Sequence, residues 1–230
     1  ECFMKADSLY ASINDSEYRA YVWVRLYNSY HVIGDKEQYD KLREKLLSIY
    51  ENNVINNSEI SLIVASQIGK FYEDSGDYEN ALKAYELSLK SSRSYYGEDS
   101  PQTFPICYEL TSLCILIGNL KGALELMEYL KNICVSHPEK EEEYISYILL
   151  NCKLLSKLGR IGEAIALLEN DRTGTEKTDN IELKSLFYTT LGGLYAEIGE
   201  YEEALTLEKQ SLSLCEKATG KESVGYAHTL

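Results

Sequence analysis

The 230-residue chain has little of what breaks helices or attaches a protein to nucleic acid or membrane. Its three prolines, Pro101, Pro105 and Pro138, leave long stretches free of the residue that most reliably interrupts a helix. No apolar run approaches the roughly 20 residues that a transmembrane helix needs. Only 23 basic side chains stand against 37 acidic ones, a formal net charge of −14. We therefore expect neither membrane insertion nor nucleic-acid binding, because the latter requires a cationic surface.

Residues that could carry catalysis are scattered. His31, His137 and His228 do not lie at helical spacing from a cysteine, serine or carboxylate that would form a nucleophile–base pair. A glycine-rich phosphate loop and a C-x-x-C metal pair are both lacking. We therefore expect no catalytic residue, no metal site and no cofactor, and an enzyme is the least favoured class of function.

Six cysteines are present, and an even number would suit disulfides in a small secreted protein. This chain is neither small nor loop-rich, and four or five of the cysteines fall at core-facing helix positions. A free thiol there behaves as a small apolar side chain. Reduced thiols favour a cytoplasmic location. The chain begins at Glu1 rather than at a methionine. Two explanations stay open: Glu1 could be a processed terminus, which would allow export after removal of a signal peptide, or the chain could be a segment of a longer protein.

A composition of 44% apolar and 26% charged residues describes a foldable chain, and a repeat organises it. Five glycines, Gly34, Gly76, Gly118, Gly159 and Gly199, are spaced 42, 42, 41 and 40 residues apart. Glycine suits the left-handed residue that closes a helix. Three of the five are followed by Asp35, Asp77 or Asn119, which can cap the next helix. The pattern predicts a tight helix-turn-helix unit repeated five times.

Apolar and small residues recur at fixed offsets from these glycines. Five residues after them stand Tyr39, Ala81, Ala123, Ala164 and Ala204, and four before them stand Tyr30, Tyr72, Cys114, Leu155 and Tyr195. Offsets of three, four and seven residues describe one apolar helical stripe. Alanine in four units out of five indicates that the second helix closely approaches the first.

These residues resemble a known family. The pattern Trp23…Leu26…Tyr30…Gly34, the pattern Ile68-Gly69…Tyr72…Gly76-Asp77-Tyr78…Ala81 and the pattern Leu191-Gly192…Tyr195…Gly199…Ala204 are similar to the tetratricopeptide repeat. The usual repeat has 34 residues, so units of 40 to 42 resemble the long kinesin-light-chain type and its bacterial relatives. The resemblance implies an all-α, right-handed superhelical solenoid of antiparallel helix pairs.

The predicted organisation follows from the glycines. Residues 1–16 would form an N-terminal capping helix, five repeats would span 17–57, 58–99, 100–138, 139–179 and 180–221, and 222–230 would begin a sixth repeat that is cut short. First helices are expected at 17–33, 58–75, 101–117, 139–158 and 180–198. The fourth second helix is expected to end before Asp171, so that 171–180 form a mobile loop.

The resemblance also implies a ligand-binding face. In the family, side chains 13, 10, 6, 3 and 2 residues before the turn glycine point into a concave groove. The candidate groove residues are Asn28, His31, Lys70, Glu73, Tyr108, Ser112, Lys153, Lys157, Thr189 and Glu197. Asn28 and the three lysines could hold a peptide backbone or an acidic side chain. Two of the three lysines, Lys153 and Lys157, belong to the fourth repeat, which predicts a groove that is locally basic there. Tyr21, Tyr108, Ile115 and Leu116 would offer an apolar pocket, whereas Val24, Ile63 and Leu186 could equally pack against the next repeat.

Two hypotheses of function remain. The first is a non-enzymatic protein–protein interaction scaffold that binds a peptide or protein segment in the groove. The second makes the chain the sensory or regulatory arm of a larger signalling protein, with an effector domain beyond residue 230. Because an array needs a polar terminal cap, the interrupted sixth repeat also predicts self-association through the C-terminal end.

Overall fold

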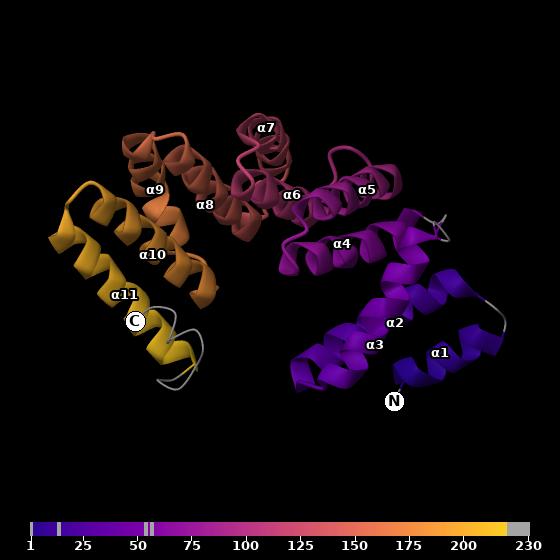
Figure 1. Ribbon diagram of the computed structural model, residues 1–230. Coiled ribbons are helices and arrows are strands. Elements are labelled where there is room, and N and C mark those ends of the chain that lie inside the picture. The colour runs from indigo at the N-terminus through magenta and orange to yellow at the C-terminus, as the bar shows by residue number, and fades with distance from the viewer. Residues whose placement is uncertain (1, 13–14, 53–54, 56–57, 220–230) are drawn as a thin grey trace. The chain divides into compact units, whose positions relative to one another are not determined.

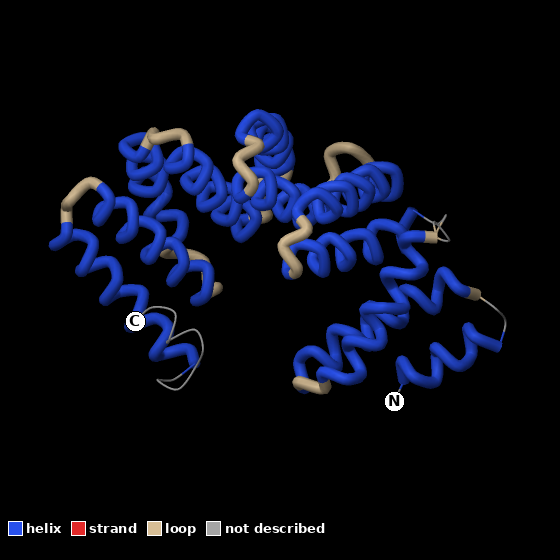
Figure 2. Tube along the Cα trace, in the orientation of Figure 1, coloured by secondary structure: helices blue, strands red, loops and turns tan. Residues whose placement is uncertain are grey.

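The computed structural model describes residues 2–12, 15–52, 55 and 58–219. This part of the chain forms eleven α-helices and one short 3-10 helix and contains no strand (Figures 1 and 2). The predicted all-α fold of helix pairs is therefore confirmed. The chain divides into two compact units, residues 1–117 and 118–230.

The helices of each unit follow the predicted order. The first unit contains α1 (Cys2–Ser12), α2 (Ser16–Ile33), α3 (Lys36–Glu51), α4 (Ser58–Asp74), α5 (Tyr78–Tyr96), the 3-10 helix Pro101–Thr103 and α6 (Phe104–Leu116). The second contains α7 (Leu120–Ser136), α8 (Glu141–Lys157), α9 (Ile161–Thr175), α10 (Ile181–Glu197) and α11 (Tyr201–Thr219). The first helices thus lie where they were expected, to within three residues. The repeat boundaries stay a prediction, and residues 222–230, with the self-association assigned to them, lie outside the described residues.

The turns between paired helices have the predicted geometry. The five turn glycines, Gly34, Gly76, Gly118, Gly159 and Gly199, all have positive φ, between 73° and 88°. L-residues rarely adopt this left-handed conformation, and glycine enters it without steric cost. The carboxylates of Asp35 and Asp77 and the amide oxygen of Asn119 each accept a hydrogen bond from a backbone N–H in the first turn of the next helix. All five pairs therefore turn at a left-handed glycine, and in the first three the second helix also has an N-terminal side-chain cap.

Small residues bring the paired helices together. Ala81, Ala123 and Ala164 are fully buried, and Ala204 is 7% exposed. On α4, Gly69 leaves the space that the ring of Tyr85 on α5 occupies, because a Cβ at Gly69 would lie 2.6 Å from that ring. No real Cβ contact is that short, so Gly69 is required by its neighbour.

Each unit has its own core. In the first unit Trp23, Leu46, Ile68 and Phe71 belong to one buried cluster. In the second unit the corresponding cluster includes Ile148, Leu168, Phe187 and Leu191.

The fourth repeat departs from the prediction. Helix α9 continues to Thr175, so the expected end before Asp171 is wrong. The Thr175 hydroxyl donates to Asp171 Oδ2 at 3.2 Å, and Arg172 lies 3.5 Å from a carboxylate oxygen of Glu169, so side-chain pairs at helical spacing support the last turns. Thr175 is also 1% exposed. Burial and local pairing thus extend a helix whose composition suggests a loop.

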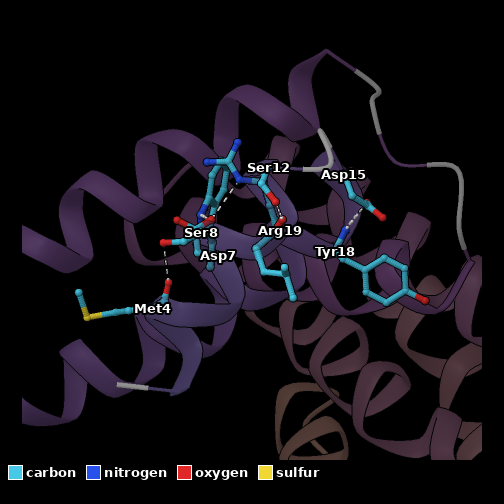
Figure 3. Close-up of polar contacts among 9 residues, drawn as sticks. Met4, Asp7, Ser8, Ser12, Asp15, Tyr18 and Arg19 are labelled. Atoms are coloured by element: carbon cyan, nitrogen blue, oxygen red, sulfur yellow. Dashed lines mark hydrogen bonds and ion pairs between the residues drawn. The ribbon is translucent and has the colours of Figure 1, made fainter.

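The N-terminal helix α1 buries none of its residues and is held to α2 by a ring contact and by polar contacts, some of which Figure 3 shows. Asp7 Oδ1 accepts hydrogen bonds from the Trp23 indole Nε1 at 2.8 Å and from Arg19 Nε at 3.1 Å. The rings of Tyr10 and Tyr18 stack at 5.3 Å. Asp7 is therefore the main polar link between α1 and the first repeat.

The six cysteines, all within the described residues, form no disulfide, and four of them, Cys107, Cys114, Cys134 and Cys152, are buried, as the sequence predicted. Burial raises the pKa of the Cys107 and Cys152 thiols to about 12. Within the described residues, no helix is both long and apolar enough to span a bilayer.

Candidate functional site

A hollow in the first unit is lined by residues from three successive repeats. It has a volume of 440 Å³. Its lining comes from α2, α4, α5 and α6 and consists of Tyr27, Asn28, His31, Gln67, Lys70, Glu73, Asp74, Tyr85 and Glu109. We call this site the unit-1 hollow. Four of the ten candidate groove residues meet in it: Asn28, His31, Lys70 and Glu73.

The lining follows the repeat register. Asn28 and Lys70 both stand six residues before their turn glycines, and Gln67 and Glu109 both stand nine before theirs. Lys70 Nζ lies 3.5 Å from Glu109 Oε1. We number these positions by their distance before the turn glycine. Lys70, at position six of its repeat, thus contacts Glu109, at position nine of the next repeat, and this ion pair joins two neighbouring first helices across the hollow.

Glu73 is held in place by the second helix of its own repeat. The Tyr85 hydroxyl donates to Glu73 Oε2 at 2.9 Å. Burial, together with this hydrogen bond and the nearby carboxylates, raises the pKa of Tyr85 far above its ordinary value, so the phenol stays protonated and remains a donor. Gly69 makes this contact possible because it admits the Tyr85 ring against α4.

Aromatic rings form one wall of the hollow. Tyr27 packs on Phe71 at 4.7 Å between ring centroids and on Tyr39 at 5.6 Å. The exposed ring of His31 lies 5.9 Å from Tyr27 and 5.4 Å from Tyr39. Tyr39, which replaces the alanine of the other repeats, thus supports the histidine ring at the edge of the hollow.

The charge of the hollow is negative. Three carboxylates, Glu73, Asp74 and Glu109, line it with a single ammonium, that of Lys70, which is paired with Glu109. Glu109 stands at position nine, which the family's groove positions do not include. The local basic charge was expected at Lys153 and Lys157 of the fourth repeat, which belong to the other unit, and it stays a prediction.

The candidates on α6 lie apart from the hollow. Tyr108 is half-buried, stacks on Phe104 at 6.2 Å and has a raised pKa because of burial, and Ser112 is half-buried as well. The apolar pocket suggested by the sequence is incomplete, because Ile115 is 1% exposed and belongs to the core. Val24 is also buried, which agrees with its alternative role in packing.

In the second unit the candidates separate into two groups. Lys153 and Lys157 are exposed on α8, and the Ser156 hydroxyl of the same helix donates to Glu197 Oε2 at 3.5 Å. Thr189, by contrast, lies with its hydroxyl 2.8 Å from Ser211 Oγ on α11. This hydroxyl is therefore used between the paired helices of its own repeat, and the assignment of Thr189 to the groove stays a prediction.

The groove positions expected from the resemblance also include Asp74, two residues before Gly76, so sequence reasoning missed four lining residues: Tyr27, Gln67, Tyr85 and Glu109. A signal existed for Gln67 and Glu109, which share one register beside the assigned position six. The Tyr85 side chain extends from the second helix into the hollow only because Gly69 leaves space for its ring, and no sequence pattern indicates this. In the described part of the chain, no three His, Cys, Asp or Glu residues are grouped closely enough to hold a metal ion.

Comparisons with known proteins agree with this architecture. Two tetratricopeptide-repeat profiles match, one over residues 61–128 and the other over residues 187–224. Among curated proteins, none matches the chain by sequence.

Several solved structures share the fold. BtubC (BKLC) from P. vanneervenii is 17% identical with a TM-score of 0.71, and the match covers 96% of this chain and 89% of that one. The kinesin-light-chain repeats of Podospora anserina are 17% identical with a TM-score of 0.66, covering 89% and 99%. NprR, solved with its cognate peptide NprX, is 13% identical with a TM-score of 0.67, covering 98% of this chain and 65% of NprR. The fold is thus that of kinesin-light-chain-like repeat arrays.

Proposed function

Because the chain is a tetratricopeptide-repeat protein, we propose that it is a non-enzymatic protein-interaction scaffold that binds a peptide segment on its first helices. The observation that carries the proposal is the unit-1 hollow, to which three successive repeats contribute side chains at equivalent registers. A similar fold is found in NprR, whose structure holds a cognate peptide. The hollow is large enough for one or two side chains of an extended segment.

The lining chemistry suits a peptide. The amides of Asn28 and Gln67 each carry donors and an acceptor, so they can bond the N–H and C=O groups of an extended backbone. The rings of Tyr27 and His31 offer rigid contact area that loses little conformational entropy on binding. Glu73, fixed by Tyr85, is already oriented before any ligand arrives.

Other candidate residues would extend the site within their own units. Tyr108 and Ser112 on α6 are proposed to contact the segment in the first unit, and Lys153, Lys157 and Glu197 in the second. The alternative, that the same binding regulates an effector domain elsewhere in a longer chain, stays a prediction.

A hollow-filling substitution tests the proposal. Random decapeptides displayed on phage are selected on the full chain, and selected peptides are synthesised with a fluorophore for anisotropy titration. Asn28→Phe places a bulky neutral ring in the hollow at an exposed helix position and should weaken binding at least tenfold, or about 1.4 kcal/mol. Asn132→Phe, on the exposed face of α7, is the matched control. Equal affinity of the two variants for every selected peptide would show that the hollow is not the binding site.

A further inference from the structure

The unit-1 hollow carries more negative charge than its own residues balance. Lys70 is its only lining cation, and its ammonium is 3.5 Å from Glu109. Glu73 receives a neutral phenol hydrogen bond, and Asp74 lies beside it on α4. The nearby Arg43 of α3 donates to the Phe71 carbonyl oxygen at 2.8 Å and lies over the Phe71 ring. Among the lining residues, two carboxylates are therefore left without a lysine or arginine to match them.

These two carboxylates also stand where the helix disfavours them. Glu73 and Asp74 end α4, and the last turn of that helix has no basic residue. The C-terminal end of a helix carries partial negative charge from its unpaired carbonyl groups, so carboxylates there reduce helix stability. Arg43 places one cationic group at this end, on the Phe71 carbonyl oxygen. A positively charged ligand would in addition reduce the mutual repulsion of the two carboxylates.

We infer that the unit-1 hollow takes a cationic side chain, that of an arginine or a lysine, from the bound peptide segment. This inference rests on the proposed function and specifies the chemistry of its ligand. A guanidinium can bond carboxylates in two directions while its plane lies against an aromatic ring, and the hollow offers both partners in Glu73, Asp74 and the rings of Tyr27 and His31. An acidic side chain would instead face three carboxylates and would have to separate Lys70 from Glu109.

The decapeptide selection described above tests this chemistry directly. Peptides selected on the full chain should be enriched in arginine and lysine relative to the unselected library. In a selected peptide, replacing the critical arginine by citrulline, which keeps the shape and removes the charge, should weaken binding about tenfold, the loss typical of a charge-assisted pair. The affinity should also fall as salt is raised from 50 to 300 mM, and the citrulline peptide should respond less.

Two variants of the protein locate the effect. Asp74→Asn and Glu109→Gln should each weaken the arginine peptide about three- to tenfold and leave the citrulline peptide unchanged. Asp74→Asn should in addition raise the thermal midpoint by about 1–3 °C, because it removes a charge from the C-terminal end of α4. Glu86→Gln, an equally exposed carboxylate on α5, is the matched control and should alter neither affinity.

The outcomes separate the inference from the proposed function. Selected peptides that are blocked by Asn28→Phe but are acidic or uncharged overturn the cationic preference and leave peptide binding in place. An arginine peptide that binds Asp74→Asn, Glu109→Gln and the wild-type chain equally also overturns it. A selection that yields no binding peptide overturns both the proposed function and this inference.

Discussion

Replacing Asp7 by alanine should release the N-terminal helix from the first repeat. Asp7 Oδ1 accepts from both Trp23 and Arg19, at 2.8 and 3.1 Å, and α1 has no buried side chain that could hold it otherwise. A hydrogen bond to a charged group contributes about 1.5–3 kcal/mol. Because the Asp7 and Arg19 side chains are 27% and 30% exposed, we take the lower part of that range and expect a loss of about 2 kcal/mol.

The single tryptophan of the chain reports on this change. Trp23 is 7% exposed beneath Arg19 and Lys45, whose cationic groups lie 5.0 and 5.3 Å from its ring. In Asp7→Ala its emission should shift to longer wavelength, and the urea midpoint followed by that emission should fall by about 1 M. Asp7→Asn keeps an oxygen acceptor for the indole and should lose about 1 kcal/mol.

Asp179→Ala, which removes an exposed carboxylate in the second unit, serves as the control and should leave both the emission and the midpoint unchanged. An Asp7→Ala protein with wild-type emission and midpoint would refute the reasoning. If Asp7→Asn were as destabilising as Asp7→Ala, the ion pair rather than the indole hydrogen bond would hold α1.

Three further predictions concern the scaffold. Gly69→Ala should lower the free energy of unfolding, measured by thermal melts, by about 1–3 kcal/mol because the added Cβ would collide with the Tyr85 ring. Gly162→Ala on α9, where the added Cβ meets open space, should be neutral or stabilising in the same measurement. Asp77→Ala removes the N-terminal cap of α5 and should cost about 1 kcal/mol, measured by urea denaturation, and a loss below 0.3 kcal/mol would argue against the cap. At pH 8, a thiol reagent should label exposed Cys2 in the native chain but reach the four buried cysteines only after unfolding. Burial raises the pKa of three of these thiols, those of Cys107, Cys134 and Cys152, from 9.0 to about 11 or 12. The protonated thiols therefore contribute fully to the stability of the fold below pH 9, and this contribution is lost as the pH rises toward 12. The urea midpoint should accordingly decline over that pH range.

The repeat was predictable because its determinants are local. Each turn glycine fixes a left-handed residue, and each following Asp or Asn caps the next helix, so spacing alone locates the first helices to within three residues. The end of α9 was not predictable in this way. Its last turns contain the local pairs Thr175–Asp171 and Arg172–Glu169, but they also depend on the burial of Thr175, which only the folded unit provides.

The site was predictable by register but not by charge. Asn28, His31, Lys70 and Glu73 meet as expected because equivalent positions of neighbouring first helices come together. The sign of the hollow depends on Glu109, which belongs to the following repeat. The orientation of the Thr189 hydroxyl depends on a contact with the second helix of its own repeat. Both contacts join residues that are distant in the sequence, so a pattern read along one helix could not supply them.

Photo-crosslinking of a selected decapeptide to the full chain tests the central claim most directly. With a benzophenone placed next to the cationic residue, the account predicts crosslinks to α2, α4 and α6, at residues lining or flanking the unit-1 hollow, and their loss in Asn28→Phe. Crosslinks concentrated on the second helices α3, α7, α9 and α11, unaffected by Asn28→Phe, would contradict it.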